Sequence, residues 1–504
     1  MNFKKKIIDF DTVAKYLKNV KKAKKIIIHC HGVFDLVHPG HIRHLSYCRS
    51  KADILIVSIT PDKFIDKGTY RPLVPEQLRA NNLSVLEIVD FVVIDKFKYP
   101  YNIIKKIRPD YFAKGNEYSN NTNPLTEKEK LVLSKFGGKM LFTPGDYVLS
   151  STKIINENEI NLKYDKLKNL IDVNNYDLDK IIKIFKKLKN LRVHVVGDLI
   201  IDTLNECEAV AGLHKSPTLS LIKKSSNSYL GGAGIVAAHF SSFAKKVTLT
   251  CLLNNDKSGN LARKYLKKYK VSLNAVKEPD RPTTEKTIFT SQKHKLLKVN
   301  NVKNESLIQS SLEKIKKILK KNDYDIVVFA DYRHGVFNKH SINQLIQCLN
   351  KKAFKVADSQ VASRWGNILD FKGFDLITPT EQEARYALLD QDLTIRALAS
   401  ALLKKSKANN LILKIGEKGL IALGKNSPEY IALDPFVNNL KDANGAGDAL
   451  LAYASAVLFK EKSLILSSIV GIIAASCKCE KLGNEPVSIK DMIDKIEAIK
   501  KYTL

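Results

Sequence analysis

The chain has 504 residues, too many for one ordinary domain, and its 44% hydrophobic and 27% charged residues are typical of a soluble globular protein. No apolar run is long enough to cross a bilayer, and the first residues lack the hydrophobic segment of a signal peptide, so we expect a cytoplasmic protein that binds no membrane. The net charge of +31 comes mostly from short lysine runs without interleaved aromatic residues. Compositional bias explains this charge better than nucleic-acid binding does.

The first part of the chain predicts alternating helices and strands. An amphipathic helix over residues 11–25 precedes an apolar strand that begins at Ile26, and a second helix begins near Ile42. Continuous apolar runs at 54–59, 89–94 and 139–142 are typical of buried parallel strands, and a helix is expected over 77–88. Residues 1–156 therefore predict a small, doubly wound α/β domain.

A second domain is predicted over residues 191–504, after a linker over 157–190 that contains a helix at 178–188. It opens with a buried strand in the run Arg192 to Asp202, followed by a polar turn, and hairpins are expected around 203–230 and 282–300. Its clearest later strands are 326–330, 354–357, 376–378 and 411–415. The alternation predicts a second α/β fold.

The seven cysteines are scattered, and no pair has CxxC spacing. This pattern predicts neither a disulfide framework nor a structural zinc site, and buried or idle thiols are expected. The cysteines are Cys30, Cys48, Cys207, Cys251, Cys348, Cys477 and Cys479.

Residues 32–41 read GxFDxxHxGH between an apolar strand and a helix start. His38 and His41 lie three residues apart, so both imidazoles fall on one face of the first helical turn, beside backbone amides that lack intrahelical partners. This arrangement suits a phosphate, although histidines at such positions can also serve only as caps or packing groups.

This stretch and the motifs after it resemble the cytidylyltransferase-like nucleotidyltransferase superfamily. The matching residues cover most of 25–156 and follow in the family's order: Arg71-Pro72, Pro75 to Arg79, Val89-Asp90, Pro109 to Gly115 and Ser150 to Ile154. A class I aminoacyl-tRNA synthetase also carries an HxGH-type signature, but nothing in the chain resembles a tRNA-binding appendage. The stretch 143–149 lacks the arginine of the glycerol-phosphate branch and resembles the heptose-phosphate branch.

The resemblance implies a reaction in which a phosphate oxygen of the acceptor attacks the α-phosphorus of a nucleoside triphosphate. His38, His41 and Lys114 would be the catalytic groups, and Asp35 would also help to hold Mg²⁺. The implied nucleotide-binding residues are Gly32, Phe34, Asp35, Arg79, Ser151 and Thr152.

A glycine-rich stretch, Asp442 to Asp448, precedes a run of small residues at 449–458 that predicts a buried helix. The amides of Gly445, Ala446 and Gly447 would form an anion hole at the helix start, and Asp448 could take a proton from an acceptor hydroxyl. Alternatively, this stretch is only a glycine-rich turn without a chemical role. No GxxxxGK[ST] motif occurs, which excludes a P-loop.

Residues from about 190 to 504 resemble the ribokinase (pfkB) family of sugar kinases. Besides 442–448, the matching residues are Gly197-Asp198, Asp202, Gly231 to Ala233, Pro282-Thr283 with Lys286, Ala330 to Tyr332, Thr378 to Glu383 and Lys414 to Gly419. The resemblance implies a ribokinase-like α/β sandwich with a small β lid, in which Asp448 is the catalytic base.

The same resemblance implies the other roles in this domain. Sugar-binding residues would be Asp198, Asp202, Gly231 and Gly232, and Glu383 would serve Mg²⁺. Residues for ATP and its phosphates would be Asn444, Gly445, Ala446, Gly447, Lys414, Gly416, Gly419 and Lys286. Ile235 and Thr380 stand where heptose kinases of the family usually have Asn, and the loss of an amide from a sugar pocket removes a donor and an acceptor.

Together the halves resemble the bifunctional heptose-phosphate kinase/nucleotidyltransferase family, with the domains in the opposite order from the usual fusion. The expected substrates are ATP, ATP or CTP as nucleotidyl donor, and sugar phosphates, in a homo-oligomer that uses Mg²⁺ and a monovalent cation in the kinase domain. One alternative is a cytidylyltransferase for a polyol phosphate or phosphonate, fused to a kinase of unrelated specificity. A more remote one is a basic nucleic-acid-binding protein.

Overall fold

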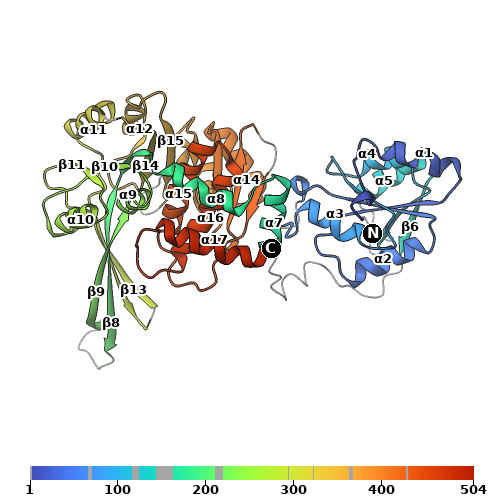
Figure 1. Ribbon diagram of the computed structural model, residues 1–504, viewed down its shortest axis with the longest axis horizontal. Helices are drawn as coiled ribbons and strands as arrows, with labels where there is room; N and C mark the ends of the chain where they lie inside the picture. The colour runs from blue at the N-terminus through green and yellow to red at the C-terminus, as the bar shows by residue number, and fades with distance from the viewer. Residues whose placement is uncertain are drawn as a thin grey trace. The chain divides into compact units, whose positions relative to one another are not determined.

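The computed structural model describes residues 3–65, 71–115, 124–143, 163–210, 219–292, 294–321, 323–361, 367–426 and 430–503. The chain divides into two compact units, Met1–Asn169 and Leu170–Leu504, and each is described by itself. Both units are α/β folds, as the sequence predicts (Figure 1).

The first unit is built on a six-stranded parallel sheet in the order β1-β4-β3-β2-β5-β6. Its strands are β1 (Ile7–Ile8), β2 (Ile27–Gly32), β3 (Ile54–Ile59), β4 (Phe91–Ile94), β5 (Tyr111–Gly115) and β6 (Lys139–Thr143). Its described helices are α1 (Val13–Lys22), α2 (Pro39–Arg49), α3 (Glu76–Ser84), α4 (Tyr101–Ile107) and α5 (Pro124–Ser134). The strand order reverses direction at β2, so the carboxyl end of β2 lies at a switch point, where α/β sheets bind ligands.

Alternating side chains give this sheet two buried faces. Ile28 packs in one core with Leu45 of α2, whereas Ile27, the next residue, packs in another with Leu17 of α1 and Ile107 of α4. Adjacent residues of a strand point to opposite faces, so helices on both sides explain the unbroken apolar runs.

The second unit contains a nine-stranded sheet in the order β11-β10-β7-β14-β15-β16-β17-β18-β19, antiparallel only at β18. The strands are β7 (Arg192–Gly197), β10 (Lys246–Leu252), β11 (Ser272–Val276), β14 (Ile326–Asp331), β15 (Phe354–Ser359), β16 (Leu376–Ile377), β17 (Asn410–Lys414), β18 (Leu420–Gly424) and β19 (Ile431–Leu433).

A second sheet, in the order β13-β12-β8-β9, projects from the body of this unit as a lid (Figure 1). Its strands are β8 (Leu199–Val210), β9 (Ser220–Gly232), β12 (Glu285–Ser291) and β13 (His294–Asn301). The predicted hairpins around 203–230 and 282–300 are these antiparallel pairs. The structure differs from the sequence reading at 199–202, where the chain enters the lid strand β8 and not a polar turn.

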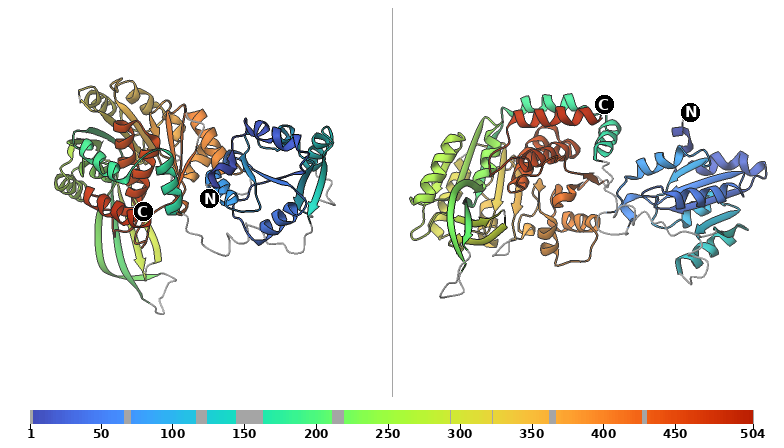
Figure 2. Two further views of the ribbon diagram at one scale, coloured as in Figure 1. Left: turned by 45° about the vertical axis from the view of Figure 1, so that its right-hand side comes forward. Right: turned by 90° about the horizontal axis from the view of Figure 1, so that it is seen from below.

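Helices cover both faces of the large sheet. The helices are α8 (Leu178–Leu188), α9 (Ala233–Ser241), α10 (Lys257–Lys268), α11 (Gln309–Lys321), α12 (Lys339–Ile346), α13 (Glu381–Leu388), α14 (Ile395–Ser406), α15 (Ala446–Glu461), α16 (Leu464–Cys479) and α17 (Ile489–Thr503), and α7 (Lys163–Val173) crosses the boundary between the units. Small residues line α15 because α16 packs closely on it: a Cβ added at Gly471 would lie 3.0 Å from Cβ of Ala454. The predicted helix at 178–188 is α8, which lies beside α17 (Figure 2).

Candidate active sites

The first candidate site lies where β2 ends and α2 begins. His38 is the N-cap of α2, and its Nδ1 accepts a hydrogen bond from the amide of Gly40 at 3.1 Å. Burial lowers the pKa of His38. A neutral His38 with an accepting Nδ1 carries its proton on Nε2, which can then donate to a phosphate oxygen.

His41 lies against His38, with ring centroids 3.9 Å apart. The ring of Phe34 also packs against His41, with a centroid distance of 4.9 Å. Phe34 itself is buried and has a positive φ of 48°, and a Cβ on Gly32 would approach its ring to 3.1 Å. The structure therefore brings Gly32, Phe34, His38 and His41 together, as predicted.

Asp35 lies in the same loop, but its carboxylate holds the chain in place. It accepts hydrogen bonds from the amides of Leu73 and Val74 at 3.0 and 2.8 Å, and the Nε atom of Arg71 lies 2.7 Å from Oδ2. A guanidinium at this distance competes with a metal ion for the same oxygens. This corrects the prediction that Asp35 holds Mg²⁺: its contacts are those of a structural anchor.

Arg79 also differs from its predicted role. Its side chain is fully buried, and it donates to the carbonyls of Val33, Val74 and Thr60 and to the carboxylate of Asp62. A guanidinium enclosed in this way has no face left for a nucleotide. The prediction that Arg79 binds nucleotide is therefore corrected, since the residue ties α3 to the loops at the ends of β2 and β3.

Replacement of Arg79 should consequently affect stability more than nucleotide affinity. We expect Arg79→Met to destabilise the first domain by about 3 kcal/mol or more, because the Asp62 carboxylate and three carbonyls lose their partner. Hydrogen-exchange mass spectrometry on peptides from residues 27–65 measures this. The control is Arg49→Met, which removes a half-exposed pair with Asp90 and should cost below about 1 kcal/mol. Unchanged protection with weakened nucleotide binding would restore the original prediction.

Lys114, predicted to be catalytic, lies on β5, where it forms an ion pair with Glu129 of α5 and donates to Thr126 Oγ1 at 3.2 Å. Burial raises the pKa of Glu129, and Lys114 opposes that shift. Burial, with a smaller contribution from the positive charge of Lys114, lowers the pKa of His31, on β2, to about 3. Ser151 and Thr152 lie outside the described residues.

The second candidate site centres on Asp448 in the first turn of α15. Gly445, the N-cap, has φ +79°, and a Cβ there would lie 2.2 Å from Oδ1 of Asn484, so only glycine fits. Burial raises the pKa of Asp448 to about 6, although the phenol of Tyr332 donates to its Oδ1 at 2.8 Å and opposes the shift. A carboxylate with this pKa can accept a proton near neutral pH.

Three charged side chains gather beside Asp448. Nζ of Lys414 lies 3.0 Å from both carboxylate oxygens of Asp358, and Glu383 is near enough to influence the pKa of Lys414. Burial lowers the pKa of Lys414, but Asp358 and Glu383 outweigh burial, so the pKa lies above its usual value. A Cβ on Gly447 would lie 3.2 Å from Nζ of Lys414, which places this ammonium at the predicted anion hole.

Thr380 explains how Glu383 is positioned. The two form a capping box at the start of α13, in which Glu383 Oε2 accepts from the amide of Thr380 at 2.7 Å and Thr380 Oγ1 accepts from the amide of Glu383 at 3.3 Å. One carboxylate oxygen of Glu383 is thus held by the helix cap. Ile235, the other departure from the family pattern, is fully buried within α9.

The predicted sugar residues separate into two groups. Asp202 on β8 pairs in register with Lys286 on β12, next to Gly231 at the end of β9, and Lys286 Nζ lies 6.0 Å from the ring centroid of Tyr332. Lys286, predicted to serve ATP, therefore lies beside the predicted sugar residue Asp202.

Asp198 belongs to the other group. It is buried at the start of the lid and accepts from the amides of Tyr332, His334 and Val336 at 3.0 to 3.1 Å, and Gly232 lies against its carbonyl. The predicted contact of Asp198 with the sugar is corrected, because the carboxylate holds the loop that carries Tyr332.

The remaining predicted ATP residues lie in two loops. Asn444 is exposed, and its amide donates to Asp442 Oδ1 at 3.0 Å, one residue before Gly445 and Ala446. Gly416 is the first residue of a single 3₁₀ turn between β17 and β18, and Gly419 follows that turn. The contact between Lys414 and Gly447 brings the two loops together.

The sequence analysis assigned no role to three residues of this site. Tyr332, Asp358 and Lys478 carry no glycine-rich or helix-start signal, and only the fold brings them to Asp448. Lys478, near the end of α16, is fully buried, and its Nζ has no hydrogen-bond partner among the described residues. Its Cε lies 3.5 Å from the position that a Cβ on Gly445 would occupy, directly behind the anion-hole loop. Burial lowers the pKa of Lys478, and Asp442 and Asp448 oppose that shift.

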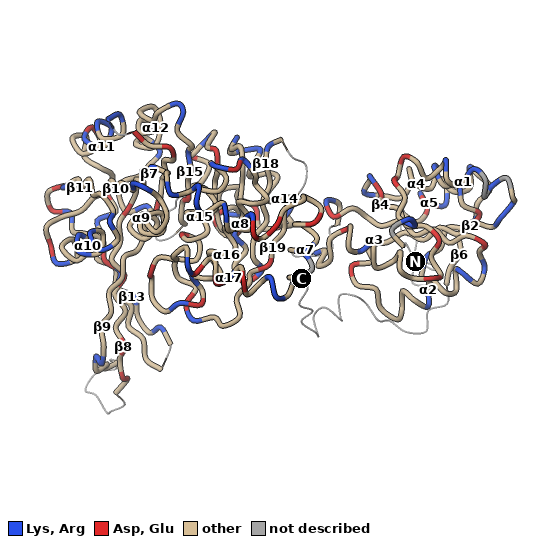
Figure 3. Tube along the Cα trace, in the orientation of Figure 1, with Lys and Arg blue, Asp and Glu red and all other residues tan. Residues whose placement is uncertain are grey.

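Lysine and arginine recur along most elements of both units and gather on no single segment (Figure 3). This distribution agrees with compositional bias as the origin of the net charge. Among the described residues, no helix has both the length and the apolar character needed to span a membrane.

Comparison with known proteins gives relatives for parts of the chain. "Bifunctional protein HldE" of Sulfurimonas denitrificans is 27% identical over 312 residues, which cover 61% of this chain and 64% of that protein. The protein of the same name from Nitratiruptor is 38% identical over 114 residues, covering 22% of this chain and 25% of the relative. Each match thus spans less than two thirds of the relative.

Solved structures match the larger part of the chain. Phosphofructokinase-2 from Escherichia coli in complex with fructose-6-phosphate has a TM-score of 0.51 at 15% identity, over 62% of this chain and 99% of that one. Ribokinase from Arabidopsis thaliana complexed with ribose and ATP has a TM-score of 0.50 at 17% identity, over 61% and 99%. At these identities the likeness shows the fold.

Two family models match the chain side by side. The cytidylyltransferase-like model matches residues 29–157, which contain His38 and His41. The model of the pfkB family carbohydrate kinases matches residues 190–490, which contain Asp448 and Lys414. Since that match covers more than half of the 504 residues, the chain belongs to the pfkB family of carbohydrate kinases and carries a cytidylyltransferase-like domain before it.

Proposed function

We propose that the chain is a bifunctional enzyme of nucleotide-activated heptose synthesis. The C-terminal domain would transfer a phosphoryl group from ATP to a sugar phosphate, and the N-terminal domain would couple a sugar 1-phosphate to ATP or CTP with release of pyrophosphate. The observation that carries the proposal is the setting of Asp448: a buried carboxylate with a pKa near 6, at a glycine-lined helix start, beside the ammonium of Lys414.

In the kinase step, Asp448 takes the proton of the attacking sugar hydroxyl as the oxygen bonds to the γ-phosphorus and ADP leaves. Amides at the start of α15 and the ammonium of Lys414 stabilise the charge on the transferred group. Tyr332 orients the carboxylate through its hydrogen bond. The protein's contribution is positioning and fixed charge.

The acceptor that this site favours already carries a phosphate. Lys286 on β12 faces Asp202, and Lys298 on β13 is close enough to both to influence their pKa values. This wall of the lid thus holds two ammonium groups beside the Asp202 carboxylate. Such a wall suits a sugar phosphate better than a neutral sugar.

The carboxylate of Glu383 suits Mg²⁺, which binds few carboxylates together with substrate phosphates. When bound, Mg²⁺ would neutralise phosphate charge. Asp358 itself is held in an ion pair with Lys414. The monovalent cation predicted for this domain stays a prediction. Lys478 places a fixed positive charge beside Gly445.

In the N-terminal domain, Nε2–H of His38 and the ring of His41 would donate to the α- and β-phosphates as pyrophosphate leaves. Amides at the start of α2 add donors to the same phosphates. The acceptor is a sugar 1-phosphate, and a phosphatase would have to act between the two steps if the kinase product still carries its first phosphate.

A substrate panel tests the kinase assignment. Purified protein is offered heptose 7-phosphate, fructose 6-phosphate, ribose and a polyol phosphate, each with ATP and Mg²⁺, and ADP is measured by a coupled assay. We expect heptose 7-phosphate to give the highest kcat/KM. Activity on ribose alone would overturn the sugar-phosphate acceptor, and activity on the polyol phosphate alone would favour the alternative specificity.

The pH profile of the kinase follows from Asp448. Because protonated Asp448 cannot act as a base, kcat should fall as the pH drops below about 6. Tyr332→Phe removes a hydrogen bond that favours the charged carboxylate, so the pKa of Asp448 should rise and the acid limb should move to higher pH. A kcat profile of both proteins from pH 5 to 8 (roughly the range that brackets this pKa) measures the shift. If the acid limb does not move, the titration of Asp448 is not its cause.

Lys478→Met tests the buried ammonium behind the anion hole. Removing this charge should lower kcat of the kinase roughly 10- to 100-fold, since a fixed charge near the transferred phosphoryl group is lost in a low-dielectric region. Steady-state kinetics should show little change in KM for the sugar. The matched control is Lys481→Met. Lys481 lies just beyond the end of α16 and its ammonium pairs with Asp491, so this variant should retain kcat.

A further inference from the structure

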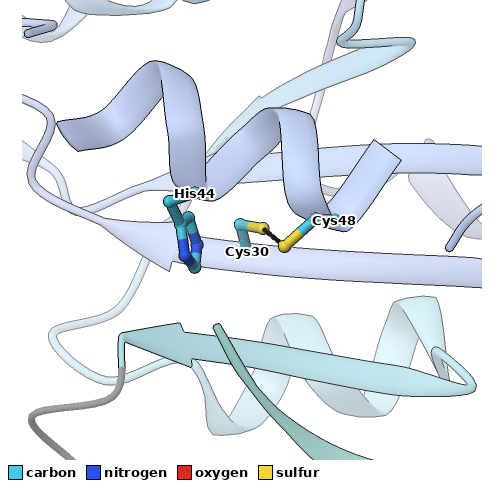
Figure 4. A group of neighbouring side chains, drawn as sticks. All are labelled: Cys30, His44 and Cys48. Carbon is cyan, nitrogen blue, oxygen red and sulfur yellow. Dashed lines mark hydrogen bonds between the residues drawn. The ribbon is translucent and has the colours of Figure 1, made fainter. Parts of the chain in front are cut away.

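Two of the seven cysteines meet in the core of the N-terminal domain, directly under the helix that carries His38 and His41. Cys30 lies on β2 and Cys48 on α2, both fully buried, with their sulfur atoms 3.6 Å apart. His44 lies one helical turn before Cys48 on the same face of α2, and its ring turns toward the two thiols (Figure 4). A ring nitrogen of His44 and both sulfurs all lie within 4.8 Å of one another.

We infer that Cys30, Cys48 and His44 form a binding site for a thiolate-preferring metal ion, with Zn²⁺ as the representative ligand. Zn–S bonds of about 2.3 Å at tetrahedral angles place two sulfurs about 3.8 Å apart. The observed separation of 3.6 Å is close to this value and far from a disulfide bond. Two thiolates and one imidazole are ligands that zinc prefers, and a fourth position remains for water.

The surroundings of the site support a metal ion. Nδ1 of His44 lies 2.8 Å from Oγ1 of Thr143, which also donates to the carbonyl of Lys114 at 3.3 Å. A hydrogen-bond partner of this kind fixes the ring of a metal-ligating histidine. On binding, two thiol protons leave and two thiolates neutralise the ion, so the core gains no net charge.

The position of the site indicates a structural role, separate from the chemistry at the start of α2. Cys30 belongs to the central strand, while Cys48 and His44 belong to the helix that holds the two catalytic histidines. A shared ion would clamp α2 to β2 and fix the direction in which His38 and His41 point. The cysteine spacing in the sequence gives no such signal, because a strand and a helix 18 residues apart supply the ligands.

Metal titration of the full chain tests this site without any substrate. Reduced, metal-free protein is titrated with Zn²⁺ in competition with a chromophoric chelator, and separately with Co²⁺, whose thiolate complexes show sulfur-to-metal charge-transfer bands. We expect one tightly bound equivalent per chain, with a cobalt spectrum of a tetrahedral thiolate site. The equivalent should disappear in Cys30→Ala and Cys48→Ala.

The matched control is Cys479→Ser, which removes a half-buried thiol of the other domain and should leave the stoichiometry at one. His44→Gln keeps the buried core intact, so it should fold and still lose the tetrahedral cobalt spectrum. Absence of a tight equivalent in the parent protein would overturn the inference, as would an equivalent that survives Cys30→Ala or is lost in Cys479→Ser. These outcomes are independent of ADP or pyrophosphate formation, so the proposed function stands or falls separately.

Discussion

Asp448→Asn should lower kcat of the kinase by about 10³-fold, because the amide cannot take the proton of the sugar hydroxyl. Asparagine keeps the size of the side chain and can still accept from the Tyr332 phenol, which holds Asp448 at 2.8 Å. We therefore expect little change in KM for ATP and no change in pyrophosphate release by the other domain. ADP formation from ATP and heptose 7-phosphate is the measurement.

The control for this variant is Asp494→Asn on the exposed side of α17, which should keep full activity. A normal kcat in Asp448→Asn would remove Asp448 as the base and leave fixed charge as the whole contribution of the site. Parallel loss of pyrophosphate release would mean that the change had damaged the protein as a whole.

His41→Ala should lower nucleotidyl transfer by about 10²- to 10³-fold, the range found when a donor to a developing charge is removed. The imidazole packs against the rings of His38 and Phe34, so its loss also removes packing from His38. Pyrophosphate release from ATP or CTP with a sugar 1-phosphate measures the effect.

ADP formation by the kinase should be unaffected in the same preparation. His340→Ala, which removes an exposed histidine of the other domain, is the control and should change neither reaction. Full pyrophosphate release by His41→Ala would contradict the phosphate-binding role of α2.

The sequence predicted the parts of the fold that depend on local pattern. The runs at 54–59 and 178–188 are β3 and α8 with the same bounds, because a continuous apolar run and a 3.6-residue apolar period are unambiguous signals. The glycine-rich stretch before Asp448 likewise marks a helix start. The sequence could not show which charged side chains hold the fold together and which face a substrate.

Arg79, Asp35 and Asp198 illustrate this limit. Each sits inside a motif whose family role is binding, yet each is buried and bound to backbone groups within its own domain. A basic or acidic residue in a motif looks the same whether it faces a ligand or a carbonyl. Tyr332 and Lys478 show the converse, since long-range packing alone brings them to Asp448 and Gly445.

One measurement tests the central claim, that a single chain carries a sugar-phosphate kinase and a nucleotidyltransferase. Purified protein with Mg²⁺ is given heptose 7-phosphate and ATP in one reaction, and heptose 1-phosphate with ATP or CTP in another, followed by ³¹P NMR. The account predicts ADP and a heptose bisphosphate in the first reaction, and pyrophosphate with a nucleoside-diphosphate heptose in the second. Unchanged substrates in both, with activity on no other sugar phosphate, would contradict it.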